Sequence, residues 1–266
     1  MINLKKEETH DHILPIILGN YQNDPVKTID LNAIPGLLIE TNHNSETISV
    51  FNFLIYNLLN YNVPEVLRFA MLNSNKNGFN YDCLPGQYIT YFGRKRMVKN
   101  GIDESNSLLD LFVKEIETRY NLLKDARVRN LNDFNKRNKD EIPFLVIFVN
   151  DFREFSNKLG KEFEIKLARL VTLGKSVGIN LIIATSRIDL YVKSVYIDDN
   201  FPVQMIFNHE ISPEMDKTII DSKKNLNKLS DFLYVNSQKK RKKTEQFSYN
   251  YIENKEFIDF LKELEE

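Results

Sequence analysis

The sequence has a single cysteine, Cys83, among its 266 residues. One cysteine excludes an internal disulfide framework and is compatible with a reducing cytosol. Burial preferences favour a buried small side chain over a reactive nucleophile at this position. The chain also lacks an excess of charge, because its 36 Lys and Arg residues nearly balance its 37 Asp and Glu residues. No global field therefore draws the whole chain to nucleic acid or to a membrane.

Long apolar runs are missing as well. The N-terminal stretch MINLKKEETHDH is polar and charged, and it contains no apolar core of a signal peptide. No uninterrupted apolar stretch approaches the roughly 20 residues that cross a bilayer. We expect a chain that is soluble as given, although such a chain could still be the cytosolic piece of a larger membrane protein.

Residue patterns typical of metal centres and of hydrolases are absent too. The histidines are scattered, with no metal-ligand spacing beyond a weak His-Asp-His near the N-terminus; they are His10, His12, His43 and His209. No nucleophile motif such as G-x-S-x-G occurs. The sequence therefore predicts neither a metal site nor an independent catalytic site.

The chain does contain short apolar runs that alternate with helical patterns. Buried strands of a parallel sheet read as continuous apolar runs. Four such runs stand out: GLLIE at 36–40, LRFAML at 67–72, FLVIFVN at 144–150 and INLIIATS at 179–186. This alternation predicts an α/β domain with a mostly parallel sheet. Because no internal repeat or long linker is visible, we expect one domain over residues 1–266.

The first two helical patterns have serine at their expected starts. The pattern over 45–61 can begin with Ser45 as its cap, and it is apolar on most faces. The pattern over 105–126 can begin at Ser105 or Ser107. Its expected buried stripe consists of Leu109, Phe112, Ile116 and Tyr120.

A third helix is expected over 154–178, with its left-handed end at Gly174 or Gly178. Further along, the sequence predicts a strand at 203–209, a short helix at 212–220 and an amphipathic helix at 253–266. DFLYVNS at 231–237 and QFSYNYI at 246–252 flank the polar run QKKRKKTE. These two segments predict an antiparallel hairpin with a basic tip.

The segment TNHNSETI, 41–48, follows an apolar strand and precedes a helix, which is where a phosphate-binding P-loop would stand. The P-loop pattern G-x-x-x-x-G-K-[ST] supplies glycine backbone N–H groups and a lysine for phosphate, and a hydroxyl for Mg²⁺. The corresponding positions here hold Thr41, Glu46, Thr47 and Ile48. Glu46 would set a carboxylate against a polyanion, and two unit charges at 4 Å interact by about 4 kcal/mol near an effective dielectric of 20.

Several segments together resemble FtsK/SpoIIIE-type translocase ATPases. The resemblance rests on IETRYNLLKDARVRNLNDFN at 116–135, which is similar to the E-x-R-Y…V-R-N-[LI]-x-x-[FY]-N segment, and on IPFLVIFVNDFREF at 142–155, which looks like the Walker B strand. GKSVGINLIIATSRIDL at 174–190 resembles the RAxGIHLILATQRP strand, and KLSDFLYV at 228–235 the GxGDMLY segment. The start, 14–31, resembles the opening strands of tandem ATPase domains in type VII secretion coupling proteins, the EssC/EccC group. The matches are collinear and cover nearly the whole chain.

This resemblance implies a RecA-like P-loop NTPase fold, with a mostly parallel sheet flanked by helices and a C-terminal antiparallel hairpin and helix. In its register, the remnant of the nucleotide site comprises Thr41, Asn42, His43, Asn44, Ser45, Glu46, Thr47, Ile48, Asn150 and Asp151. The Walker B Asp-Glu pair becomes Asn150-Asp151, which removes one charge and shortens the second carboxylate side chain. Because misplaced groups cost orders of magnitude in rate, the resemblance predicts a pseudo-ATPase that binds ATP and Mg²⁺ weakly or not at all.

Of two arginines in the family pattern, one is present in this sequence and the other is replaced. Arg187 matches the arginine of the ATQRP segment, and it could lie near the phosphates or a subunit interface. Its alternative role is a salt-bridged loop arginine that holds the end of the strand. The arginine of the later RIAF strand is replaced by Gln204.

The resemblance further implies a degenerate C-terminal domain of a type VII secretion coupling ATPase. Such a domain recognises secreted WXG100-type helical-hairpin proteins, regulates their export and contacts neighbouring ATPase domains of the same coupling protein. It lies on the cytoplasmic side of the bacterial membrane, through the anchor of its parent. Two alternatives stay open: a weakly active ATPase, and a DNA-translocase fragment that binds DNA through the basic run 238–243. The default for such a run is a solvated hairpin tip, so we expect no nucleic-acid partner.

Overall fold

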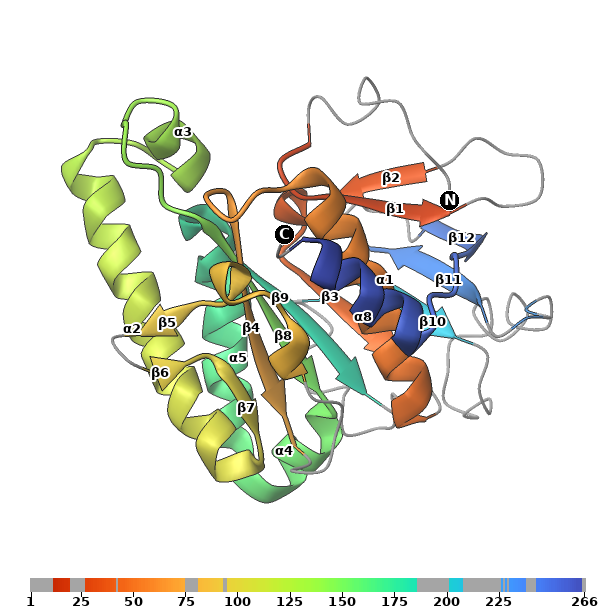
Figure 1. The fold of residues 1–266 in the computed structure, drawn as a ribbon. Coiled ribbons are helices and arrows are strands. Elements are labelled where there is room, and N and C mark those ends of the chain that lie inside the picture. Colours follow the sequence, from red (N-terminus) through yellow and green to blue (C-terminus); the bar gives the residue numbers. More distant parts are fainter. Residues whose placement is uncertain are drawn as a thin grey trace.

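The computed structural model describes residues 12–19, 27–41, 43–74, 81–92, 95–185, 201–207, 226, 228, 230–237 and 243–264. An eight-stranded sheet runs through its centre (Figure 1). From one edge to the other, the strands are β12 (Lys243–Ser248), β11 (Asp231–Asn236), β10 (Val203–Phe207), β3 (Gly36–Glu40), β9 (Ile179–Thr185), β8 (Phe144–Asn150), β4 (Leu67–Asn73) and β7 (Val98–Asn100). The pairings from β10 to β7 are parallel, and β11 and β12 add antiparallel strands. The expected mostly parallel sheet and C-terminal hairpin are confirmed.

The four apolar runs of the sequence form the middle of this sheet. Every residue of β3, β8 and β9 is buried. Side chains of a strand alternate between the two faces of a sheet. In β8, accordingly, Val146 and Phe148 pack in one hydrophobic cluster, and Leu145, Ile147 and Val149 pack in the other. Burial on both faces explains why these strands read as unbroken apolar runs.

Helices cover both faces (Figure 1). One cluster joins the sheet to α1 (Asn44–Tyr61), to α8 (Asn254–Glu263) and to the hairpin of β1 (Pro15–Gly19) and β2 (Lys27–Asp30). The other cluster joins it to α2 (Ile102–Asp125), α4 (Phe152–Leu159) and α5 (Lys161–Gly174). Among the described residues, no helix is both long and apolar enough to cross a membrane.

Helix α1 is bonded to segments near both ends of the described chain. The Asn57 side chain accepts a hydrogen bond from the Ile17 backbone N–H of β1, at 3.1 Å. The hydroxyls of Ser49 and Tyr249 are 3.0 Å apart. Burial raises the pKa of Tyr249 to about 12, against the effect of the Ser49 hydrogen bond. The helix that follows the predicted nucleotide loop is therefore fixed from both directions.

Several shorter elements were not predicted from the sequence. They are β5 (Tyr91–Phe92), β6 (Lys95–Arg96), β7 and α3 (Leu131–Asn135). Strands of two or three residues carry too few side chains to show a hydrophobic period. The predicted helix at 212–220 and the predicted tip of the basic hairpin, 238–242, lie outside the described residues.

The predicted serine caps are wrong. Helix α1 begins at Asn44 after His43, and α2 begins at Ile102 after Gly101, with no side-chain cap hydrogen bond at either start. Ser105 lies inside α2, where its hydroxyl donates to the Asn73 carbonyl of β4 at 3.4 Å. Tertiary contact with the sheet thus outweighs the local preference of serine for a helix start.

The single helix predicted over 154–178 is also wrong, because Gly160 divides it into α4 and α5. Gly160 has φ +65° and ψ −153°, an extended conformation with positive φ that glycine adopts readily and that interrupts the helix. At the far end, Gly178 has φ +73° and Gly174 remains helical, so Gly178 is the left-handed residue of the two candidates. In the hairpin, β12 spans Lys243–Ser248 and so begins three residues earlier than the segment 246–252 predicted for it.

The expected stripe of α2 requires one correction. Leu109, Phe112 and Ile116 are buried as predicted, but Tyr120 is 60% exposed. The buried stripe continues instead through Arg119 and Leu123. Ile116, Arg119 and Leu123 follow one another in steps of three and four residues, so they share one face of the helix. Tyr120 also follows Ile116 by four residues, so its spacing alone does not reveal that it is exposed.

Candidate nucleotide site

The predicted nucleotide loop connects the end of β3 to the start of α1. Three of its backbone N–H groups, those of Thr41, Glu46 and Thr47, donate to carbonyls of the chain itself. The amide of Thr41 donates to the Thr185 carbonyl of β9 at 3.1 Å. The amides of Glu46 and Thr47 both donate to the His43 carbonyl, at 3.0 and 3.1 Å. These amides form the first turn of a helix, whereas a P-loop directs its amides at phosphate.

Thr47, which stands where a P-loop has lysine, points inward. It is 4% exposed, and its hydroxyl oxygen lies 2.6 Å from the Thr41 hydroxyl oxygen. Thr41, in turn, stands at the first glycine position and is fully buried. The two residues that replace a glycine and the lysine therefore bond to each other across the base of the loop.

Asn150, at the Walker B aspartate position, bonds directly to the loop. Its amide nitrogen donates to the Asn44 side-chain oxygen at 2.9 Å and to the Asn73 side-chain oxygen at 3.3 Å. Asn73 and Asn150 are opposite each other at the ends of β4 and β8. The sequence did not single out Asn73. Its signal was present, because Asn73 directly follows the apolar run of β4 and the carboxyl ends of parallel strands meet at one sheet edge.

Asp151, at the position of the catalytic glutamate, has a left-handed backbone with φ +63° and ψ +59°. Its carboxylate accepts a hydrogen bond from the Ser74 hydroxyl at 3.1 Å and one from the Glu154 amide at 3.4 Å. Asp151 thereby caps α4. A left-handed non-glycine residue costs of order 1–3 kcal/mol, and such residues persist only where neighbouring contacts hold them.

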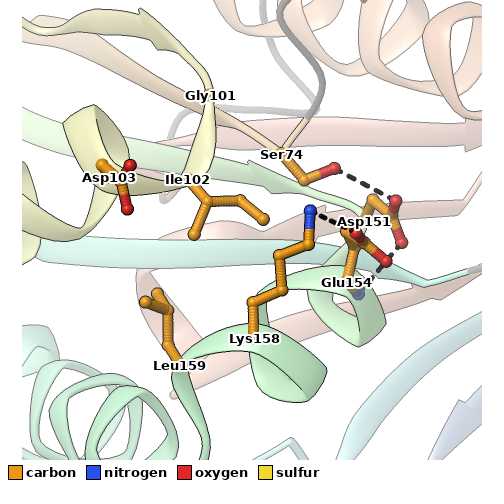
Figure 2. Close-up of a pocket in the computed structure, with 8 residues that line it drawn as sticks. All are labelled: Ser74, Gly101, Ile102, Asp103, Asp151, Glu154, Lys158 and Leu159. Carbon is orange, nitrogen blue, oxygen red and sulfur yellow. Dashed lines mark hydrogen bonds and ion pairs between the residues drawn. The ribbon is translucent and has the colours of Figure 1, made fainter.

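A cavity of about 760 Å³ opens beside Asp151 (Figure 2). It is lined by Ser74, Gly101, Ile102, Asp103, Asp151, Glu154, Lys158 and Leu159. Figure 2 shows Lys158 reaching from α4 toward the neighbouring carboxylates, and its ammonium lies 2.9 Å from Glu154. Three carboxylates against one ammonium make this lining unsuited to a polyphosphate.

A magnesium–nucleotide therefore does not fit the side chains of this loop. The lysine position is buried threonine, the two glycine positions hold Thr41 and Glu46, and the hydroxyl position is Ile48. Asn150 is neutral and directs its N–H groups, not an oxygen, at the loop. Among the residues that the structure describes, no group of three His, Cys, Asp or Glu side chains is arranged to hold a metal ion.

The remaining predicted site residues divide by their placement. His43, Asn44 and Ser45 are exposed at the start of α1, and Ile48 is half-buried. Asn42 and Arg187 lie outside the described residues. Gln204 lies in β10, opposite Leu38 of β3.

The E-x-R-Y segment has a structural role that its sequence alone did not reveal. Arg119 is buried, and one of its guanidinium nitrogens donates to the carbonyls of Pro143 and Val177, at 3.0 and 3.1 Å. A second nitrogen bonds to Glu115 at 2.8 Å. Burial lowers the pKa of Arg119, against the effect of Glu115. Arg119 thus joins α2 to the residues that lead into β8 and β9, and so helps to fix the start of β8, the strand at the Walker B position.

Comparison with known proteins gives relatives in sequence and in fold, although no family model matches the chain. The chain is 28% identical over 226 residues to the DNA translocase FtsK of Chlorobaculum tepidum, a match that covers 83% of this chain and 28% of the relative. It is 28% identical over 287 residues to the DNA translocase FtsK of Borreliella burgdorferi, covering 97% and 35%. The chain spans about a quarter to a third of the length of these relatives.

Solved structures share the fold. The conjugation coupling protein TcpA of pCW3, solved with ATPγS, has a TM-score of 0.73 at 19% identity, over 99% of this chain and 73% of TcpA. The cytoplasmic domain of the type VII secretion ATPase EccC from Thermomonospora curvata has a TM-score of 0.71 at 16% identity, over 94% of this chain and 31% of EccC. ATPases 2 and 3 of the same EccC, in complex with a signal sequence peptide, reach 0.70 at 11% identity, over 94% and 46%.

The resemblance expected from the sequence is thus confirmed at two levels. The curated relatives match it in sequence, and the solved structures match the parallel sheet and its flanking helices. In sequence and in fold, this chain is similar to the ATPase domains of the FtsK/SpoIIIE type.

Proposed function

We propose that this FtsK-type domain does not hydrolyse ATP, and that it acts in recognition and regulation within a larger translocation protein. The observation that carries this proposal is the direct hydrogen bond between Asn44 of the loop and Asn150 of β8. Catalysis of phosphoryl transfer requires a metal and phosphates at this position. Buried Thr47 at the lysine position supports the same conclusion.

The cargo that we propose is the export signal of a secreted WXG100-type helical-hairpin protein. The support is the fold shared with ATPases 2 and 3 of EccC, a structure that contains a signal sequence peptide. Neighbouring ATPase domains of the same coupling protein are the second proposed partner, because this chain covers less than half of that structure. The domain would then act on the cytoplasmic side of a bacterial membrane, attached through its parent.

A second candidate is a role in DNA translocation. The observation that favours it is sequence identity, because the curated relatives named DNA translocase FtsK reach 28%, whereas the secretion ATPases reach 11–16%. A DNA-binding domain would neutralise phosphates with Lys and Arg, so its binding constant would fall steeply as salt rises.

Two assays test the proposal on the whole chain. The first follows phosphate release with MgATP, with and without a candidate export peptide or duplex DNA, and we expect no release above background. The second follows fluorescence anisotropy of labelled export peptides and of labelled duplex DNA between 50 and 300 mM salt. Saturable peptide binding with little salt dependence supports a recognition domain for export. Salt-sensitive DNA binding without peptide binding would instead support a role in DNA translocation. Sustained phosphate release would contradict the proposal that the domain does not hydrolyse ATP.

A further inference from the structure

Three asparagines meet at the carboxyl edge of the sheet, one from each of three neighbouring segments. Asn44 begins α1, Asn73 ends β4 and Asn150 ends β8. Asn150 is the donor to both others, at 2.9 and 3.3 Å. Asn73 and Asn150 are buried, whereas Asn44 lies at the surface.

The chemistry of Asn150 suits this position. A carboxamide has two N–H donors, and an ionised carboxylate has none. Asn150 directs its nitrogen to the side-chain oxygens of Asn44 and Asn73. An aspartate could bond to these two residues only if both turned their carboxamides to present N–H groups instead.

Further hydrogen bonds fix the segments that carry Asn73 and Asn44, the two asparagines that each bond to Asn150. The Asn73 carbonyl accepts a hydrogen bond from the Gly101 amide at 2.7 Å, which fixes the end of β4 to the start of α2. On the other side, Thr41 bonds through its side chain to Thr47 of α1 and through its amide to Thr185 of β9. Hydrogen bonds therefore connect the ends of β4 and β8 to Asn44, and the ends of β3 and β9 to Thr47, and the first turn of α1 carries both residues.

We infer that the Asn44–Asn150–Asn73 hydrogen-bond chain takes the place of a metal-bound nucleotide as the link between the loop, β8 and β4. In a nucleotide-binding site of this type, metal and phosphates join the loop after the first strand to the Walker B strand. Here side chains of the chain itself make that connection. This inference rests on the proposed loss of nucleotide hydrolysis and names what stabilises the site instead.

Hydrogen exchange of the loop, measured on the whole chain without nucleotide, tests the inference. Asn44→Ala removes the acceptor for Asn150 at an exposed position, and alanine is a good helix former, so the fold should persist. We expect the amides of Glu46 and Thr47 to exchange about tenfold faster, which corresponds to about 1.4 kcal/mol. The matched control is Asn60→Ala, an exposed asparagine near the other end of α1, whose amide bonds to the Tyr56 carbonyl.

Asn150→Leu supplies a second variant, because leucine has a similar volume and no donor. It should accelerate exchange in the loop and also at the end of β4, while circular dichroism reports an intact fold. If both variants leave loop exchange within twofold of the Asn60→Ala control, the hydrogen-bond chain does not hold this edge and the inference is wrong. Because no nucleotide is present, this result is independent of whether the domain hydrolyses ATP.

Discussion

At the scale of single residues, the loop is defined by side chains that bond inward. The hydroxyls of Thr47 and Thr41 bond to each other, and the side-chain oxygen of Asn44 accepts a hydrogen bond from Asn150. The identities of these residues were readable from the sequence, because the family register assigned each of them a position. Their contacts were not readable, since Asn73 and Asn150 are 77 residues apart and meet only when β4 and β8 pair.

Arg119 gives a prediction at the same scale. Lysine keeps the charge of arginine but cannot supply the planar set of donors that reaches Glu115, Pro143 and Val177 together. We expect Arg119→Lys to lower the free energy of unfolding by about 2 kcal/mol or more, measured by urea denaturation. Arg169→Lys is the control, because its ion pair with Glu117 is solvent-exposed and such pairs contribute less than about 1 kcal/mol. Equal losses in the two variants would contradict the role assigned to Arg119.

At the scale of helices and strands, the central sheet was predicted well and the helix ends were not. The strands β3, β8 and β9 are buried on both faces, so composition alone marks their extent. Helix starts depend on what lies next to them in space. Serine is a residue type that favours helix starts, yet Ser105 lies inside α2, where its hydroxyl donates to the last carbonyl of β4.

Two glycines with positive φ, Gly160 and Gly178, differ in how much space surrounds them. A β-carbon at Gly178 would lie 2.1 Å from the Leu131 side chain, whereas one at Gly160 would meet nothing within 4 Å. Gly178 lies in the left-handed helical region, which costs alanine about 1–2 kcal/mol. Gly160, with φ +65° and ψ −153°, lies in a region that is essentially restricted to glycine and costs other residues about 1–3 kcal/mol. We therefore expect Gly160→Ala to lose about 2 kcal/mol from the backbone alone, and Gly178→Ala about 3 kcal/mol, because overpacking adds to its backbone cost. Thermal denaturation measures both, and a Gly178→Ala loss no larger than the backbone cost of about 1–2 kcal/mol would show that Leu131 can move aside.

At the scale of the whole molecule, α1 joins the nucleotide loop to the two outer parts of the chain. The hairpin of β1 and β2 reaches it through Ile17, and the segment after β12 reaches it through Tyr249. Both parts of the chain thus contact α1, the helix that in a P-loop protein follows the phosphate-binding loop. These contacts are made by side chains and backbone of the chain itself.

Tyr249 makes this connection sensitive to alkaline pH. Tyrosine has an ordinary pKa of about 10, and burial raises that of Tyr249 to about 12. Between these values the unfolded chain loses a proton that the folded chain keeps, so the free energy of unfolding falls as pH rises. We expect wild type to lose about 2–3 kcal/mol more than Tyr249→Phe between pH 9 and 12, measured by urea denaturation. Tyr251→Phe, at an exposed site, should behave like wild type; a constant gap between wild type and Tyr249→Phe would argue against burial of this hydroxyl.

Calorimetric titration of the whole chain with MgATP, up to millimolar concentration, tests the central claim that the loop no longer accepts a nucleotide. We predict no saturable heat while circular dichroism reports a folded protein. The double substitution Glu46→Gly and Thr47→Lys restores a glycine and the lysine at the positions that a P-loop requires, and it shows whether the loop itself is limiting. Saturable binding by wild type with micromolar affinity, about −8 kcal/mol, would contradict the account, because Asn44 and Thr47 would then have to leave the contacts described here.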